Sequence, residues 1–232
     1  MTHYRAILFD LDDTLLDFQT CESNALESAF RLICPVLGSD WKQIWATYEP
    51  ISRVHWRSRN KITREGVVER SIRDALLAIG RTAEAAPALA QEYWSIFCRT
   101  GYLRDGAQET LKGLSEHYCL GVVTNGYADA QRGRLKAAGL LSCFDVVLIS
   151  EEAGYTKPDG RIFECAMREL GVVPAETLFV GDSVEHDYYG ALNAGIDFCY
   201  YRTGKDSTNF PVRPTFEIGA LPELADLLLS PI

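Results

Sequence analysis

The stretch FDLDDTLLDF, residues 9–18, places three carboxylates within four positions, at Asp10, Asp12 and Asp13. It follows the apolar run YRAILF, which predicts a buried strand over residues 4–10. Carboxylates this close together repel one another and resist burial unless a cation holds them. The sequence therefore predicts a cation-binding site at the end of the first strand.

The composition is that of an ordinary globular protein, with 232 residues, 47% apolar and 24% charged. A net charge of −9 argues against a binding surface for a nucleic acid polymer or an anionic membrane, but not against a basic pocket for a small phosphorylated metabolite. No apolar run approaches the roughly eighteen residues of a membrane span, and no leader pattern precedes the first strand. The seven cysteines show no zinc-site spacing, which favours reduced thiols. We therefore expect a cytoplasmic protein; its oligomeric state stays open.

The chain divides into two kinds of pattern. From about residue 19 to 102, apolar residues recur at helical spacing, with breaks expected at Pro35–Gly38, around Pro50 and at Gly80–Thr82. From about residue 103, the strand-like runs CLGVVT, FDVVLI, TLFVG and FCYY alternate with helix-like runs. This alternation predicts an α/β fold with a doubly wound parallel sheet. We expect residues 1–17 and 103–232 to form the α/β core, and residues 18–102 to form an all-helical insert after the first strand.

Polar side chains follow several of these strands, and the carboxyl ends of parallel strands meet at one edge of a sheet. Each group alone has an ordinary explanation: an acidic turn, an Asn-Gly turn, a helix N-cap, or a lysine before a proline. Their joint occurrence favours a single site. In chain order they are Asp10, Asp12, Thr124, Asn125, Lys157 and Asp182.

The segments DLDDT, VVTNG, YTKPD and GDSVEHD, in this order, resemble the four motifs of the haloacid dehalogenase (HAD) superfamily. The resemblance covers residues 1–15 and about 103–205, and it implies a Rossmann-like core with a helical cap between the first two motifs. It further implies a Mg²⁺-dependent phosphatase that works through an aspartyl-phosphate intermediate. A phosphate monoester is a dianion, so an anionic nucleophile needs compensating positive charge to approach it.

By this resemblance, Asp10 is the nucleophile. Asp12 protonates the leaving oxygen and then takes a proton from the attacking water. The Asp10 carboxylate, the Asp12 backbone carbonyl and the Asp182 carboxylate are implied Mg²⁺ ligands.

The phosphate oxygens are expected to be held by Thr124 and Lys157, with Asn125 and the Gly126 backbone close by. Asp187 is expected to orient the metal site or Lys157. Asp13 is interpreted as structural or supporting.

Asp12 also distinguishes reaction classes. HAD dehalogenases lack an aspartate two places after the nucleophile, so its presence favours phosphoryl chemistry. A phosphomutase stays open. A receiver domain would be about half this length and would lack the helical insert. An inactive HAD-like binding protein should have lost at least one of Asp10, Asp12, Lys157 and Asp182, and the chain keeps all four.

The substrate is less well defined by the sequence. The segments LLDF and EEAGYTKPD favour a resemblance to the phosphatases of pyrimidine and non-standard nucleoside 5'-monophosphates. N-acylneuraminate 9-phosphate and sugar phosphates remain alternatives. Phe18, Trp56 and Tyr155 are candidate pocket residues. Trp56 lies in the basic run RVHWRSRNK, residues 53–61, where it could stack on a substrate. The alternative is an inward-packed side chain on an amphipathic helix with a solvated basic face.

Overall fold

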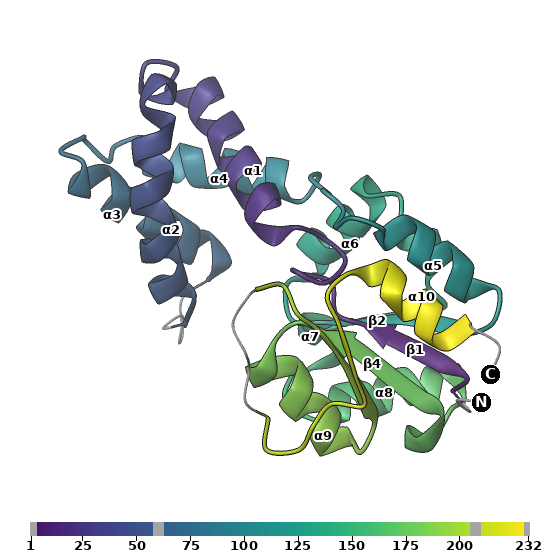
Figure 1. Ribbon diagram of the computed structural model, residues 1–232. Coiled ribbons are helices and arrows are strands. Elements are labelled where there is room, and N and C mark those ends of the chain that lie inside the picture. Colours follow the sequence, from purple (N-terminus) through teal and green to yellow (C-terminus); the bar gives the residue numbers. More distant parts are fainter. Residues whose placement is uncertain (1–3, 58–62, 205–209, 230–232) are drawn as a thin grey trace. The chain divides into compact units, whose positions relative to one another are not determined.

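The computed structural model describes residues 4–57, 63–204 and 210–229. The chain forms two compact units (Figure 1). The core unit comprises residues 1–18 and 101–232, and the helical unit comprises residues 19–100. The part of the basic run that falls in residues 58–61 lies outside the described residues.

The core unit is built on a parallel sheet, and its described strands lie in the order β3-β2-β1-β4-β5-β6. Phe9, the last residue of β1, pairs with Val122 on one side and Val180 on the other, so β1 lies inside the sheet. This arrangement confirms the expected doubly wound α/β fold. The strand bounds are β1 Ala6–Phe9, β2 Cys119–Thr124, β3 Val146–Ile149, β4 Thr177–Gly181, β5 Asp197–Tyr201 and β6 Phe216–Ile218.

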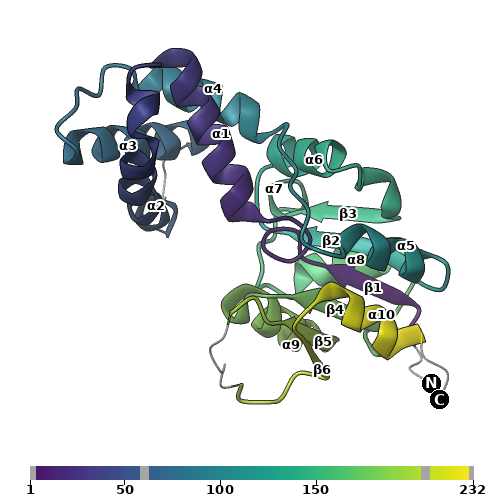
Figure 2. The same ribbon diagram turned by 45° about the horizontal axis from the view of Figure 1, so that its top comes forward.

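Helices cover both faces of the sheet (Figure 2). Alternate residues of β1 face opposite sides: Ile7 and Phe9 join one apolar cluster, and Ala6 and Leu8 join the other. The first cluster includes residues of α5 (Ala107–Ser115), α6 (Ala128–Ala137) and α10 (Leu221–Leu229). The second includes residues of α8 (Arg161–Leu170) and α9 (Tyr189–Ala194). The shorter elements of this unit are η2 Leu141–Cys143, α7 Ser150–Ala153, η3 Pro174–Glu176 and η4 Val184–Tyr188.

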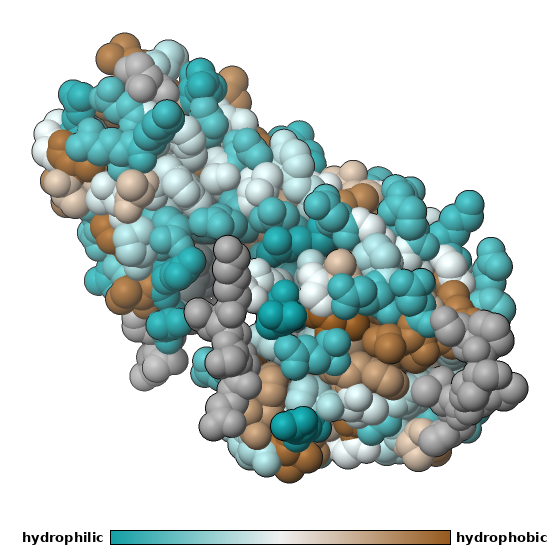
Figure 3. Space-filling model, viewed as in Figure 1, coloured by the Kyte–Doolittle hydropathy of each residue, from teal (hydrophilic) through white to brown (hydrophobic). Residues whose placement is uncertain are grey.

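The described elements of the helical unit are helices, as the periodicity predicts. Figure 3 shows that the visible face of this unit is largely hydrophilic with scattered apolar residues, as expected of amphipathic helices. The break expected around Pro50 is wrong, because α2 continues through this residue. Ile44, Tyr48 and Ser52 are buried on one face of α2, and this burial outweighs the backbone hydrogen bond that proline cannot donate. The bounds are α1 Phe18–Ile33, η1 Leu37–Asp40, α2 Trp41–Arg57, α3 Arg64–Ala78 and α4 Ala86–Phe97.

The chain leaves and re-enters the core unit along two adjacent segments. Leu16 pairs with Leu103 as an antiparallel bridge. The amide of Asp17 donates to the Tyr102 carbonyl at 2.9 Å, and the amide of Arg104 donates to the Leu15 carbonyl at 2.9 Å. The two crossing segments are therefore held together by backbone hydrogen bonds inside the core unit.

In the part of the chain that the structure describes, no helix combines the length and apolar character that crossing a membrane would require.

Candidate active site

The loop after β1 turns sharply at Asp13, which has a left-handed backbone with φ of 58°. Aspartate tolerates this conformation better than most residues. Its Oδ1 accepts from Arg104 Nη2 at 2.9 Å and from the Phe18 amide at 3.3 Å, and its own amide donates to the Leu16 carbonyl at 2.8 Å. These contacts fix the loop that carries Asp10 and Asp12, which supports the structural interpretation of Asp13.

A cavity of about 240 Å³ opens beyond the carboxyl ends of β1, β2 and β4. This is where open parallel sheets bind ligands, next to the point at which the strand order reverses. The cavity brings together side chains that the sequence places far apart. It is lined by Asp10, Asp12, Asp13, Thr124, Asn125, Lys157, Asp182, Ser183, His186 and Asp187.

Lys157 is the cation at the centre of this cavity. Its Nζ lies 2.6 Å from Asp10 Oδ1 and 2.7 Å from Asp187 Oδ1, and the residue is only 2% exposed. Burial by itself lowers the pKa of this amine, but the carboxylates of Asp10 and Asp187 raise the pKa above its ordinary value. Lys157 is therefore a buried positive charge held between two carboxylates.

The backbone of Lys157 is fixed by Asn125. Asn125 Nδ2 donates to the Lys157 backbone carbonyl at 3.0 Å, and the Lys157 backbone amide donates to Asn125 Oδ1 at 2.8 Å. This reciprocal pair ties the loop after β3 to the end of β2. Asn125 thus holds Lys157 in place, in addition to its predicted position near a phosphate.

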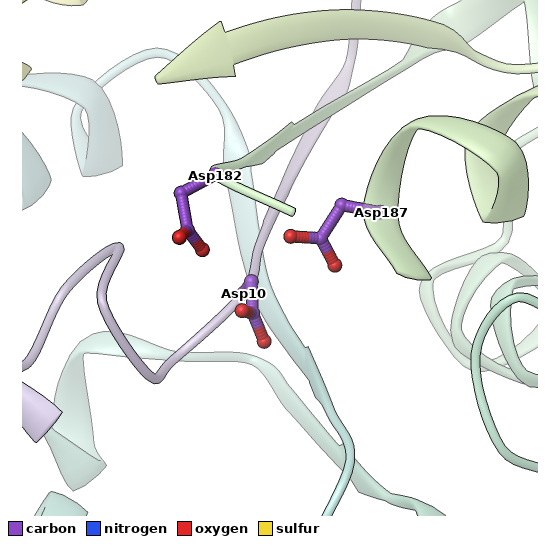
Figure 4. Close-up of side chains that lie close together, drawn as sticks. All are labelled: Asp10, Asp182 and Asp187. Carbon is purple, nitrogen blue, oxygen red and sulfur yellow. The ribbon is translucent and has the colours of Figure 1, made fainter. Parts of the chain in front are cut away.

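Asp10, Asp182 and Asp187 point toward a common space from three segments of the chain (Figure 4). One ligand oxygen from each lies within 4.8 Å of the others. Burial, followed by the charge of Asp187, raises the pKa of Asp10 against the opposing effect of Lys157. The same two causes raise the pKa of Asp182 to about 7. A single lysine thus compensates three neighbouring carboxylates incompletely, so the residues present fit a hard divalent cation with oxygen ligands.

Asp187 differs from the other two carboxylates because both of its oxygens have protein partners. Oδ1 contacts Lys157, and Oδ2 accepts from the Ser183 amide at 2.9 Å. Gly181 leaves the room for this arrangement, since an added Cβ would collide with the Asp187 carboxylate. These contacts favour the predicted orienting role for Asp187 and leave Asp10 and Asp182 as better candidates for metal ligands.

Two side chains of α6 that the sequence interpretation missed hold Asp12. Gln131 Nε2 donates to Asp12 Oδ2 at 2.9 Å and to Thr124 Oγ1 at 2.8 Å. Arg134 is fully buried, and its Nη1 lies 2.6 Å from Asp12 Oδ1. A buried arginine is rare unless it is paired, but one sequence does not reveal which helical arginines are buried.

The other predicted residues are less directly tied to the cavity. The Gly126 amide donates to Ser150 Oγ at 3.0 Å. The Phe18 ring lies 5.6 Å from the Arg134 guanidinium, and the Tyr155 ring lies 4.3 Å from that of Arg161; neither ring is among the lining residues. Trp56 is half-buried in the helical unit. Their roles at a pocket stay predictions.

The family model of the haloacid dehalogenase-like hydrolases matches residues 4–195. The chain belongs to this family. The HAD-hydrolase YfnB of Bacillus subtilis is 34% identical, over 98% of this chain and 97% of that protein. The crystal structure of YfnB bound to magnesium, described as revealing interdomain movement, has a TM-score of 0.80 at 32% identity over 97% of this chain and 98% of that one.

HAD relatives named for a reaction include phosphatases. The pyrimidine 5'-nucleotidase PynA of Streptococcus pneumoniae is 32% identical, over 97% of this chain and 95% of that protein. The N-acylneuraminate-9-phosphatase of Mus musculus is 24% identical, over 99% of this chain and 96% of that protein. These HAD relatives confirm the expected enzyme class, a phosphoric monoester hydrolase.

Proposed function

We propose that this HAD phosphatase hydrolyses a nucleoside 5'-monophosphate in a Mg²⁺-dependent reaction. The observation that carries the proposal is the buried Lys157, held between Asp10 and Asp187 and beside Asp182 in one cavity. Such a site offers an anionic nucleophile together with the positive charge that a phosphate dianion requires.

The proposed reaction has two steps. An Asp10 carboxylate oxygen attacks phosphorus, the ester P–O bond breaks, and Asp12 gives its proton to the leaving oxygen. Water then attacks the aspartyl-phosphate and loses a proton to Asp12, and the acyl phosphate bond breaks to release phosphate and restore Asp10. Thr124 and Lys157 hold the phosphate oxygens throughout.

Asp10 and Asp182 are the proposed carboxylate ligands of Mg²⁺, with the Asp12 carbonyl as the third protein ligand. Their incompletely compensated charge supports this assignment. When bound, Mg²⁺ would neutralise charge on the phosphate and on the nucleophile. Lys157 and Asp187 remain paired beside it.

The nucleotide assignment rests on sequence likeness. The similarity to PynA extends over nearly the whole chain and supports a pyrimidine 5'-nucleotide as the substrate. The similarity to the mouse enzyme makes N-acylneuraminate 9-phosphate the second candidate. Phe18, Trp56 and Tyr155 remain the proposed pocket residues. A phosphomutase would transfer the phosphoryl group to a second hydroxyl instead of to water.

The test is phosphate release with Mg²⁺ from nucleoside monophosphates, N-acylneuraminate 9-phosphate and sugar phosphates. We expect the fastest turnover with pyrimidine nucleotides, none after chelation with EDTA, and none from Asp10→Asn. The exposed Asp105→Asn serves as the matched control and should retain wild-type turnover. Substantial turnover by folded Asp10→Asn would overturn the assigned nucleophile, and EDTA-indifferent turnover would overturn the metal.

A further inference from the structure

The contacts of Asp12 differ from those of the other cavity carboxylates. Asp10 and Asp187 share Lys157, whereas Asp12 turns to α6, where each of its oxygens meets a different side chain. Gln131 and Arg134 lie three positions apart, so they project from the same face of the helix. We propose that these two residues position the Asp12 carboxyl group for proton transfer; this inference rests on the proposed acid and base role of Asp12.

Gln131 is held by a closed set of hydrogen bonds. Its Nε2 carries two hydrogens, and it donates to both Asp12 and Thr124. Its Oε1 accepts from Arg134 Nη1 at 3.1 Å. Since the amide is used on both sides, it cannot turn without losing a contact. It therefore links the acid/base group to a proposed phosphate-holding group at a set separation.

Arg134 is itself closely enclosed by its neighbours. It is fully buried, its Nη1 reaches both Gln131 and Asp12, and its guanidinium lies against the Phe18 ring. Gly126 makes space for the network, because a Cβ there would lie 3.0 Å from the Gln131 side chain. A network packed this closely fixes a carboxyl orientation, and a displacement of about 1 Å from the productive geometry can cost about 100-fold in rate.

The role predicts a dependence on the leaving group. An ester of a basic alcohol needs a proton from Asp12, whereas 2,4-dinitrophenyl phosphate releases a weakly basic phenolate and needs it much less. For Arg134→Met we expect kcat/KM, which reports the steps up to release of the leaving group, to fall about 30- to 100-fold on phenyl phosphate and less than about 3-fold on dinitrophenyl phosphate. Arg134→Lys, which keeps the charge, should recover part of the loss.

The matched control is Arg132→Met, two positions away on α6, where Arg132 pairs with Glu152 at the surface at 2.7 Å. This variant should hydrolyse both esters at the wild-type rate. Gln131→Met keeps the side-chain length and removes no charge, so it decides the question if Arg134→Met does not fold. We expect its loss also to be about 10-fold greater on phenyl phosphate than on dinitrophenyl phosphate.

An Asp12→Asn background completes the test. If Arg134 acts through Asp12, adding Arg134→Met to Asp12→Asn should cause less than about a 3-fold further loss on dinitrophenyl phosphate, and no more on phenyl phosphate. The positioning role would be overturned if Arg134→Met lowered turnover of both esters equally, or if it caused the same loss in the Asp12→Asn background as in the wild type. Turnover of nucleoside monophosphates by the wild type would still support the proposed function in either case. A folded, Mg²⁺-loaded wild type that hydrolyses no ester would overturn both.

Discussion

Lys157 shows how one residue can carry much of a site's stability. It is the shared cation of two buried carboxylates, Asp10 and Asp187. Removing one partner of a buried ion pair leaves an uncompensated charge and costs about 3–5 kcal/mol.

We therefore expect Lys157→Met to destabilise the metal-free core unit by about 3–5 kcal/mol at neutral pH. The measurement is the free energy of opening from hydrogen exchange of the β1 and β4 amides. Lys136→Met, which removes an exposed lysine of α6, is the control and should change this free energy by less than about 0.5 kcal/mol. Equal opening free energies in the two variants would show that Lys157 does not hold the carboxylates together.

At the same scale, the sequence predicted one half of the site better than the other. Asp10, Thr124 and Asp182 follow apolar runs, so strand-end geometry alone gathers them. Gln131 and Arg134 stand in QRGRLK, whose polar character is typical of an exposed helix face. Their burial depends on how α6 packs near the end of β2, which is a long-range property that local spacing does not contain.

At the scale of elements, α1 and α2 enclose a carboxyl group between them. Glu22 of α1 is 6% exposed, and its Oε1 lies 3.4 Å from the Tyr48 hydroxyl and 3.3 Å from the Ser52 hydroxyl of α2. Burial raises the pKa of Glu22 to about 7, while the hydroxyls and Arg53 act in the opposite direction and Glu49 adds to the rise. The two helices therefore pack best around an uncharged Glu22.

The sign of the pH effect follows from this raised pKa. The folded state binds a proton that the unfolded state releases near pH 4.5, so the free energy of unfolding falls as pH rises from about 4.5 to about 7. For this group the fall is roughly 3 kcal/mol. In Glu22→Gln it should disappear. Glu27→Gln, on the same helix but in a surface pair with Arg31, should keep the wild-type fall.

Tryptophan fluorescence during urea unfolding is a suitable measurement, because all four tryptophans, Trp41, Trp45, Trp56 and Trp94, belong to the helical unit. Unfolding curves at pH 5 and pH 8 give the difference directly. An unchanged pH dependence in Glu22→Gln would mean that Glu22 stays ionised in the folded helices.

Prediction of the elements from sequence succeeded where the apolar pattern was strong. The runs CLGVVT and TLFVG are β2 and β4, and GRIFECAMREL contains α8. The break predicted at Pro50 is wrong because the rule that proline ends a helix is local, whereas α2 is stabilised by the burial of neighbouring residues. The short β6, Phe216–Ile218, was not anticipated, since three residues carry no readable alternation and gain their order from pairing with β5.

At the scale of the whole molecule, the two crossing segments bear on whether the core unit can fold without the helical unit. Since the Asp17 amide already bonds the Tyr102 carbonyl, a short linker can join Phe18 to Gly101. A loop that closes over a small distance costs little entropy.

We expect a chain in which two glycines replace residues 19–100 to fold with the core sheet intact. Its amide spectrum and hydrogen exchange should match those of the core unit in the full chain. The same deletion combined with Leu16→Asp, which places a charge at a fully buried position, is the control and should not fold. Loss of cooperative unfolding in the simple deletion would show that the core unit depends on the helical unit.

The position of β1 in the sheet also determines when the sheet can form during synthesis. β1 pairs with β2 and β4, whose residues begin at Cys119 and Thr177. The helical unit, by contrast, is made of contiguous residues that emerge before either partner strand. On a ribosome the helices can therefore assemble early, while β1, the strand that precedes Asp10, waits as an unpaired apolar segment. A pause in translation between residues 100 and 177 would prolong this exposure, and it is in this interval that the nascent chain has most need of a chaperone.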